Sequence, residues 1–577
     1  MRQKLRFLLI LLWMILPVAA AQVAFAKPSA DTMGTTQSRK KKSGTKVTPK
    51  KAPATNRSQT ADLPSSQEER MNAVKTTIQS ILELYSTQKA TALSYCEEAM
   101  DLLDPSDPEK IRISLMLMCM DLYAQNDRPK DVLALGASMS AWVKDQKSLQ
   151  SLHFMEATAL TKLHDWKAAR LKYEECPNQD DFMVMSNVAE LYMIEGDSKR
   201  AAEAYRKSLE FGPDNPHALF GLASALHRAG KPDEAKDVFL EGVEADSQFS
   251  YLKEAFFEPE GETDFQTGFR MYEGNRLKEA RHYLQKHAAL EARPDYKAHA
   301  HALLDSIEAD LKAGKAALAT SYPVVLSNVR AAAISADARF LAFAALERDK
   351  ANEYTSVIWS LDTQTGKPFR EAAFPGEIIF DLAFVGDSTQ LRALSTQHHY
   401  ALDAADGTHD HYVFENNGEQ LPAALAPSGT DILAMTPNAL LTISPWHNPY
   451  AETPLMSVPS NISRLKVSTD RQTAVLTTAT KTELFDLNTQ ETVKTFPRSF
   501  YAYAIAAHPL ENLFALGMES GAVLVDENGM LTDFFATPGQ VVTLAFAPSG
   551  RYLMTLSEHT AEIWRIQPEE QYEEQKP

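Results

Sequence analysis

The sequence predicts a multidomain protein in which an all-helical repeat region is followed by an all-β region. In residues 67–316 the apolar residues recur at the 3.6-residue spacing of amphipathic helices, whereas residues 317–568 show the period-2 alternation of half-buried strands. Each region also repeats itself, at a spacing of 34 residues in the first and near 41 in the second. A chain of 577 residues is too long for one hydrophobic core, which agrees with this division.

The helical repeat is clearest in residues 182–249. Small residues align with small residues and large ones with large ones at a spacing of 34, namely Ala189 with Ala223, Ala201 with Ala235, Tyr192 with Leu226 and Tyr205 with Phe239. Gly196 and Gly230 align as well, each at the end of a first helix, where glycine most easily adopts a left-handed conformation. This pattern resembles the tetratricopeptide repeat, with Pro213 at that family's closing-proline position.

Two repeats cannot bury their faces alone, so further copies with weaker patterns are expected on both sides. Candidate segments lie at 71–103, 122–135, 164–173 and 272–284, and a helix over 295–312 would close the stack. The resemblance therefore implies an all-α superhelix of about six helical pairs over residues 67–316.

The β region repeats a turn that lies between two apolar strands. Ala426-Pro427-Ser428-Gly429 and Ala547-Pro548-Ser549-Gly550 are two copies, and equivalent turns centre on Asp337, Asp387, Asp470 and Leu510. With Gln540–Ile566 as its best copy, this period resembles the WD repeat, which implies a β-propeller over residues 317–568. We count six units and expect six blades, with seven as the alternative; the Gly-His and Trp-Asp pairs of that family are absent.

The last β unit supplies only three strands before a polar tail, residues 569–577. An open propeller would leave unpaired N–H and C=O groups on two facing blade edges. The short β-prone segment Tyr322–Leu326 has no other partner, so we expect it to pair with Thr560–Ile566 and close the ring.

Residues 1–26 have the pattern of a signal peptide. Arg2, Lys4 and Arg6 precede an apolar run, and Ala24-Phe25-Ala26 has the small-x-small form of a cleavage site, so the mature chain is expected to begin at Lys27. This predicts an exported protein in the periplasm or outside the cell. The alternative is an uncleaved anchor in the inner membrane, because the apolar stretch is about long enough to span a bilayer.

Residues 27–66 form a basic segment of low complexity, with nine Lys and Arg residues against Asp31 and Asp62. Its hydrophobic content is too low to offset the entropy of ordering, so we expect a disordered linker. It either contacts an anionic envelope polymer or lipid or acts only as a spacer. The whole chain carries −18, so the rest is strongly acidic, which excludes nucleic-acid binding by the folded body.

The three cysteines, Cys96, Cys119 and Cys176, lie far apart and form no C-x-x-C motif. Cys119 and Cys176 fall on small-residue packing positions of the repeat, which favours buried thiols. A disulfide remains open if the protein reaches an oxidising compartment.

No catalytic or nucleotide-binding motif fits its required context, and no cofactor is expected. The apolar innermost strands of the predicted propeller, such as 331–334 and 544–546, also argue against an active site in its channel. One set of side chains is a candidate zinc site, because a hairpin turn would bring four histidines together: His398, His399, His409 and His411.

The resemblance to tetratricopeptide repeats implies a binding groove lined by the first helix of each repeat. The matching positions are Phe154, Thr158, Met183, Asn187, Glu190, Met193, Phe220, Ser224, His227 and Arg228. They lack the Lys and Asn set with which the family clamps a free peptide carboxylate, so a protein or peptide partner with apolar side chains is expected. The alternative is that these residues pack against the neighbouring propeller.

The sequence therefore predicts an exported, non-catalytic scaffold that binds protein partners through a helical groove and a propeller face, with a role in envelope assembly, secretion or cell-wall maintenance. Two alternatives remain: an enzyme with its site in the propeller channel, and a surface tether that acts through residues 27–66.

Overall fold

The computed structural model describes most of the chain from residue 66 to residue 566. The described residues are 66–250, 262–290, 294–312, 317–324, 326–348, 353–395, 398–403, 409–413, 423–426, 432–435, 439–443, 451–454, 462–489, 491–498 and 500–566. The predicted signal peptide, the basic linker up to residue 65 and the polar tail lie outside these residues. No helix within them is long and apolar enough to cross a membrane.

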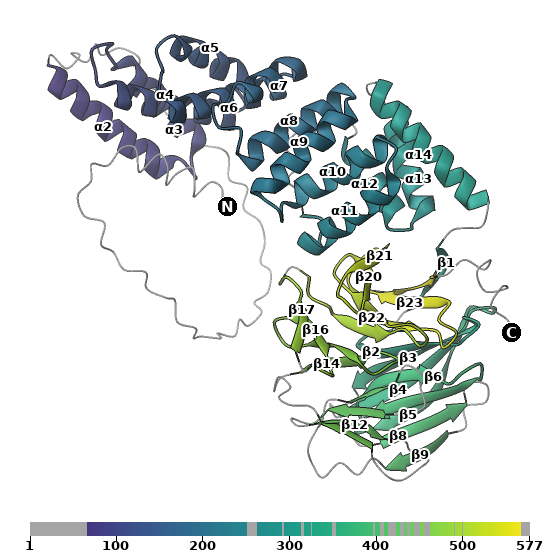
Figure 1. Cartoon of the computed structure of the whole chain (residues 1–577). Coiled ribbons are helices and arrows are strands. Elements are labelled where there is room, and N and C mark those ends of the chain that lie inside the picture. Colours follow the sequence, from purple (N-terminus) through teal and green to yellow (C-terminus); the bar gives the residue numbers. More distant parts are fainter. Residues whose placement is uncertain are drawn as a thin grey trace, which may run out of the picture. The chain divides into compact units, whose positions relative to one another are not determined.

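Helices fill the first part of the described chain, in the order of Figure 1. They are α2 (Gln67–Leu84), α3 (Lys89–Asp101), α4 (Glu109–Gln125), α5 (Pro129–Ser140), α6 (Gln146–Lys162), α7 (Trp166–Glu174), α8 (Phe182–Glu195), α9 (Ser198–Phe211), α10 (Pro216–Arg228), α11 (Pro232–Ala245), α12 (Glu262–Glu273), α13 (Leu277–Ala289) and α14 (Pro294–Lys312). Consecutive helices pack as pairs from α2·α3 to α12·α13, and α14 packs on α13.

Local chemistry sets the helix boundaries. Ser66 and Glu69 form a capping box at the start of α2. The side chain of Asp197 accepts a hydrogen bond from Arg200 N and so caps α9. Gly196 ends α8 with φ of 87°, the left-handed conformation that its alignment with Gly230 predicted.

The aligned residues of the repeat pack as the sequence predicted. Ala189, Ala201, Ala235 and Tyr205 are fully buried in one hydrophobic cluster. A Cβ added at Gly221 would lie only 2.3 Å from Cζ of Tyr205, so the absence of a side chain at Gly221 admits the tyrosine ring between the helices. The small positions thus set how closely the helices approach.

Two of the cysteines are not free thiols. Cys96 in α3 and Cys119 in α4 form a disulfide, whereas Cys176 is free and buried. The expectation of buried thiols therefore holds only for Cys176. The cause is the packing of α3 against α4, which places the two Cα atoms 5.7 Å apart, within bonding range.

The described strands follow from residue 318 to residue 565. They are β1 (Leu318–Pro323), β2 (Val329–Ile334), β3 (Phe340–Arg348), β4 (Tyr354–Asp362), β5 (Lys367–Pro375), β6 (Ile379–Phe384), β7 (Gln390–Ser395), β8 (His398–Asp403), β9 (His409–Val413), β10 (Ala423–Leu425), β11 (Ile432–Met435), β12 (Ala439–Ile443), β13 (Ala451–Pro454), β14 (Arg464–Val467), β15 (Thr473–Thr477), β16 (Thr482–Asp486), β17 (Glu491–Thr495), β18 (Ala504–Ala507), β19 (Leu513–Gly517), β20 (Gly521–Asp526), β21 (Leu531–Ala536), β22 (Val541–Phe546), β23 (Tyr552–Ser557) and β24 (Thr560–Arg565).

These strands pair into antiparallel four-stranded sheets that follow one another along the chain. The sheets are β2–β5, β6–β9, β10–β13, β14–β17, β18–β21 and β22–β24 with β1. The first strand of each sheet contacts the first strands of its two neighbours, and β2 contacts both β6 and β22. The sheets therefore surround a common channel in a propeller-like arrangement.

The blade count differs from the expected six, or seven as the alternative, because the arrangement has five regular blades. Among the described sheets, β10–β13 has the shortest strands, three to five residues long. Short strands make few ladder pairs and leave a small face to pack on the neighbouring blades. The turn at Pro427-Ser428-Gly429 lies outside the described residues.

The ring closes through β1, as the sequence predicted in kind. Strand β1 pairs with β24, so the last sheet has the order β1-β24-β23-β22. The pairing strand is Leu318–Pro323 instead of the expected Tyr322–Leu326, and Val324 N adds a hydrogen bond of 2.6 Å to His559 O. An early strand thus covers the open edge of the last blade.

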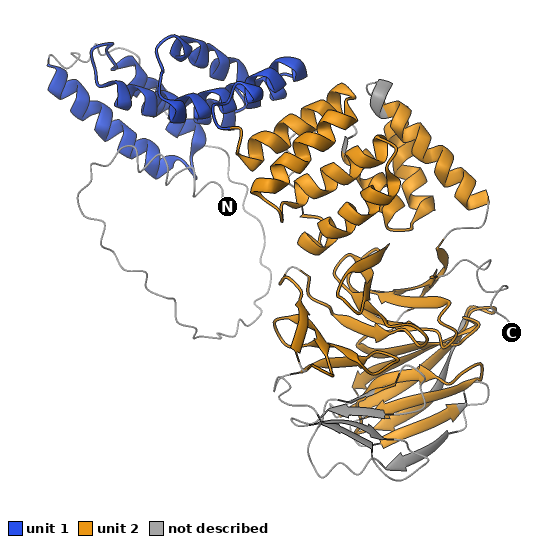
Figure 2. Cartoon of the chain, in the orientation of Figure 1, with its two compact units in different colours: residues 1–178 blue, residues 179–577 orange. Residues whose placement is uncertain are grey.

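The chain divides into two compact units, residues 1–178 and 179–577 (Figure 2). The division falls between α7 and α8, so helices α8–α14 belong to the same unit as the strands. The contacts of α11 and α12 with β21 account for this grouping.

We expect Thr320→Pro to weaken ring closure, because proline removes a backbone donor from β1 opposite Ile563. The free energy of unfolding should fall by about 1–3 kcal/mol, measured by denaturant unfolding followed by the circular dichroism of the protein. Thr320→Ala is the matched control and should change stability much less. Equal effects of the two substitutions would show that pairing of β1 with β24 does not stabilise the ring.

Candidate functional site

The expected groove residues of the first unit, Phe154 and Thr158, lie on α6 and are half-buried. The Phe154 ring packs edge-on against Tyr173 of α7 at a centroid distance of 5.4 Å. The Thr158 hydroxyl lies within hydrogen-bond distance of Phe154 O, at 2.8 Å, and of the Tyr173 hydroxyl, at 3.0 Å. Either hydroxyl can donate in the second contact. Both side chains therefore hold α6 on α7, and only part of their surface is open to a partner.

Most expected groove residues of the second unit are buried. Met193, Phe220 and Ser224 are at most 2% exposed, and Asn187 and Glu190 are below 10%. Met183 is 38% exposed, and His227 and Arg228 are half-buried. Because a buried side chain cannot meet a partner without unfolding, the groove candidates of this unit reduce to Met183, His227 and Arg228.

Two polar contacts explain why charged residues occur inside these helices. The Tyr205 hydroxyl of α9 donates a hydrogen bond of 2.6 Å to buried Glu190 of α8. Arg228 of α10 donates to Met193 O of α8 at 3.3 Å. Buried polar groups need such partners, so the first contact holds a helical pair together and the second fixes the spacing of successive repeats.

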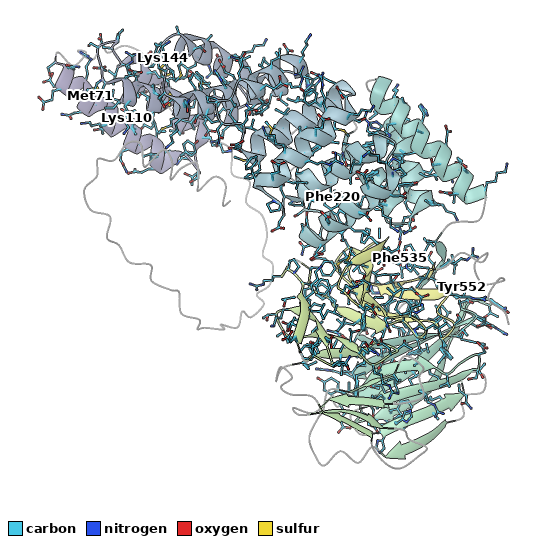
Figure 3. The ribbon with its side chains drawn as sticks, in the orientation of Figure 1. Met71, Lys110, Lys144, Phe220, Phe535 and Tyr552 are labelled. Atoms are coloured by element: carbon cyan, nitrogen blue, oxygen red, sulfur yellow. A yellow bond between two sulfur atoms is a disulfide. The ribbon has the colours of Figure 1, made fainter. Side chains whose placement is uncertain are left out.

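Phe220 belongs to an aromatic cluster that extends from the helices to the propeller. Its ring stacks on Phe249 at 5.2 Å and meets Phe239 edge-on at 5.4 Å. Phe534 of β21 lies 6.0 Å from Phe239 and 5.5 Å from Phe249. Figure 3 labels Phe220 on the helical side of this cluster and Phe535 in the neighbouring strand. The alternative expectation, packing against the propeller, thus describes the surroundings of Phe220.

The turn between α12 and α13 bonds directly to the backbone of β21. Ala536 N donates to Gly274 O at 3.0 Å, and Asn275 Nδ2 donates to Phe534 O at 3.1 Å. A Cβ added at Gly274 would lie 2.6 Å from Cβ of Ala536. Only glycine allows this approach, so the chain pairs a helical turn with the outermost strand of a sheet.

Arg276 completes this junction with charge. Its guanidinium donates to Ala536 O at 3.2 Å and to Glu562 Oε1 of β24 at 2.5 Å. Glu562 is only 1% exposed, and burial raises the pKa of Glu562 although Arg276 opposes that shift. Removal of one partner of such a buried pair typically costs about 3–5 kcal/mol. The pair therefore stabilises the position of the helices on the last two sheets.

Two more ion pairs join helices to strands at the edge of the junction. Lys236 of α11 bonds Asp533 of β21 at 2.7 Å, and Lys494 of β17 bonds Glu244 of α11 at 2.7 Å. Lys236 is about half exposed, so solvent screening leaves that pair a small contribution. These contacts set orientation more than they add stability.

Three histidines, one each from α10, α13 and α14, lie near one another among the helices. His227 of α10 lies 5.5 Å from His299 of α14, and the Phe265 ring contacts both His287 and His299. Burial, with the charge of Arg228 and the neighbouring histidines, lowers the pKa of His299 to about 2. His299 is therefore a neutral packing group, and the described residues contain no cluster of His, Cys, Asp or Glu able to hold a metal ion.

The candidate zinc site stays a prediction, although the register of β8 with β9 places His409 and His411 on the sheet face of His398. Neighbouring residues of β8 point to opposite faces, which separates His398 from His399. His398 Nδ1 contacts Glu377 at 2.8 Å, whereas His399 is 2% exposed and burial lowers its pKa to about 4. The side chains of His409 and His411 in β9 lie outside the described residues.

The sheets enclose a channel with a cavity of about 680 Å³. Its walls are mostly apolar, as predicted, but they also carry Arg330, Asp381, Arg464 and Lys466. Sequence reasoning missed these charges because it took only the apolar core of each innermost strand, such as 331–334. A charged residue just before an apolar run, such as Arg330 before residues 331–334, could have indicated a charged channel wall.

One acidic group of the channel is occupied by three donors. Asp381 accepts hydrogen bonds from Lys466 Nζ at 2.6 Å, from Leu425 N at 2.7 Å and from Leu382 N at 3.0 Å. These bonds join β6, β10 and β14 at the channel wall. A carboxylate held in this way ties the three strands together.

The comparison with protein families agrees with the helical part of the fold. Residues 192–255 match the family model of the tetratricopeptide repeat. No curated protein is similar enough to match the chain.

Two solved structures are similar to parts of the chain. A chain of "Crystal Structure of Mitotic Checkpoint Complex" is 10% identical with a TM-score of 0.34, and the match covers 44% of this chain and 92% of that one. For "Structure of U3-55K" the identity is 15%, the TM-score is 0.28, and the coverage is 41% and 80%.

Glu273, beside the junction glycine, makes stability depend on pH. Burial raises its pKa to about 7, although Lys236 lowers it. The folded protein thus resists ionisation that the unfolded chain undergoes near pH 4.5. Stability contributed by the protonated form is full below that pH and is lost as the pH rises to about 7.

Glu273→Gln should therefore stabilise the protein at pH 8 by about 1–3 kcal/mol and leave it unchanged at pH 4. Denaturant unfolding at both pH values measures the difference. Glu210→Gln, at an exposed position of α9, is the control and should show no pH-dependent gain. A gain for Glu273→Gln that is equal at both pH values would contradict the burial argument.

Proposed function

We propose that this protein is an exported, non-catalytic scaffold that holds a helical repeat surface and a propeller face in one fixed arrangement for protein partners. The observation that carries the proposal is the junction of α10–α13 with β21 and β24. Its backbone bonds at Gly274, its buried Arg276–Glu562 pair and its shared aromatic cluster join two surfaces of kinds that generally bind proteins. An enzyme that merely carries a repeat domain does not need such a junction.

Export is the second part of the proposal, with the periplasm as the favoured compartment. It is supported by the signal-like residues 1–26 and by the Cys96–Cys119 disulfide, because disulfides persist mainly in oxidising compartments. The basic residues 27–66 would then contact anionic lipid or cell-wall polymer, and the folded body would act in envelope assembly, secretion or cell-wall maintenance.

The blade count and the absence of catalysis also belong to the proposal. Six blades are favoured because β10–β13 has its own strand ladder and touches β6 and β14 on both sides. A non-catalytic role is favoured because the buried acid of the channel, Asp381, is fully occupied.

Export is tested by the N-terminus and the thiols of the protein purified from its own cells. We expect the chain to begin at Lys27 and, after denaturation without reductant, to be alkylated only at Cys176, since Cys96 and Cys119 are bonded. Reduction should expose three thiols. Mass spectrometry reads both results, and alkylation of all three cysteines without reduction would contradict an oxidising location.

The scaffold is tested at the exposed groove residue Met183 of α8. A charge in the groove should reject an apolar partner, so Met183→Glu should reduce capture of the main envelope partner by at least about tenfold. Phe211→Glu is the matched control, since Phe211 is a similarly exposed apolar residue, 42% against 38%, but on a second helix.

Quantitative mass spectrometry of proteins captured by the full-length variants gives the readout. Equal capture by wild type and both variants would refute the groove, provided that all three proteins melt at the same temperature.

A further inference from the structure

The channel of the ring contains two arginines that no described residue neutralises. Arg330 lies in β2 and Arg464 begins β14. Both line the cavity of about 680 Å³, and both are exposed within it. Neither forms a hydrogen bond or ion pair with any described residue.

A β-bulge in β2 directs Arg330 toward the channel. The register of β2 with β3 shifts between Val329 and Ala331, so Arg330 is the extra residue of a β-bulge. Phe380 in β6 and Val542 in β22 are the extra residues at equivalent bulges. A bulge re-aims a side chain, and all three of these residues line the cavity.

The two arginines line the same cavity from different walls. Strands β2 and β14 are separated by two sheets in either direction around the ring. Burial lowers the pKa of Arg464, Tyr501 opposes this shift, and repulsion from Arg330 adds to it. Such repulsion is unfavourable unless an anion relieves it.

Among the described residues that line the channel, the other charged side chains are Asp381 and Lys466. Asp381 is paired with Lys466 at 2.6 Å and bound by two backbone amides. The pair is neutral overall, so the two arginines leave an excess of positive charge in a protein with a net charge of −18. This local reversal of sign favours an anion in the channel.

The surroundings restrict the kind of anion. Apolar side chains of Phe380, Val542 and Ile462 line the cavity with the arginines. A cavity of this size fits a small ligand or a chain end. A guanidinium group matches the two oxygens of a carboxylate, and the apolar walls suit a singly charged group on an apolar body.

We propose that the channel binds a carboxylate between Arg330 and Arg464, with the apolar part of the ligand against Phe380 and Val542. The carboxylate belongs either to a small molecule or to the C-terminus of a polypeptide. This site is separate from the helical groove and its junction, so it goes beyond the proposed scaffold function, and either can fail without the other.

The test is calorimetric titration of the full-length protein with four probes: hexanoate, inorganic phosphate, and a tetrapeptide of alanine with a free or an amidated C-terminus. We expect hexanoate or the free tetrapeptide to bind, and the amidated peptide and phosphate to bind at least about tenfold more weakly. Binding by hexanoate alone identifies a small-molecule site, and binding by the free peptide identifies a chain end.

Arg330→Gln and Arg464→Gln should each weaken binding at least about tenfold. Arg498→Gln, which removes the same charge from an exposed turn, should leave binding unchanged. Without ligand, Arg330→Gln should melt no lower than wild type, because it removes a repulsion.

The proposal is overturned if none of the carboxylates binds at 10 mM, a limit of about 3 kcal/mol of binding energy. It is also overturned if phosphate or the amidated peptide binds as well as the carboxylates, if the channel variants bind like wild type, or if Arg330→Gln alone lowers the melting temperature.

Discussion

The close approach of Gly274 to Ala536 is the constraint on which the arrangement of the second unit depends. Only a residue without Cβ lets the turn after α12 reach the outermost strand β21. Once the backbones meet, Arg276 reaches the buried Glu562 of β24, and Phe534 enters the aromatic cluster of the helices. The hydrogen bonds, the ion pair and the ring contacts are therefore consequences of one missing side chain.

The junction also changes the meaning of the helical repeat. In an isolated repeat array, Phe220 would belong to a face available to partners, but here its neighbours Phe239 and Phe249 contact the propeller. The surface left for partners in this unit is smaller and more polar, with Met183 at one end and Arg228 near the other. The repeats of this unit therefore both support the propeller and offer a surface to protein partners.

Much of the fold was predictable because it rests on local periodicity. The spacing of 34 placed Ala201 and Tyr205 correctly, and the period-2 region gave the sheets and the closing strand in kind. The groove was predicted less well, because burial of Phe220 and Met193 depends on a second layer of packing that periodicity does not report. The Cys96–Cys119 bond and the charges at Arg330 and Arg464 depend on contacts between distant segments, and single positions at strand starts gave only a faint signal.

The closing strand β1 gives the order of synthesis a physical meaning. Strand β1 is synthesised before the other strands of the ring, and its partner β24 is the last described strand. Strand β1 therefore has no strand edge to join until β24 has been made. Any chain that stops before residue 560 leaves both edges of the ring unpaired, and such edges attract chaperones, proteases or other chains. A chain that includes β24 therefore has no unpaired edge between the first and last blades, whereas a truncated chain exposes edges that quality-control proteins can recognise.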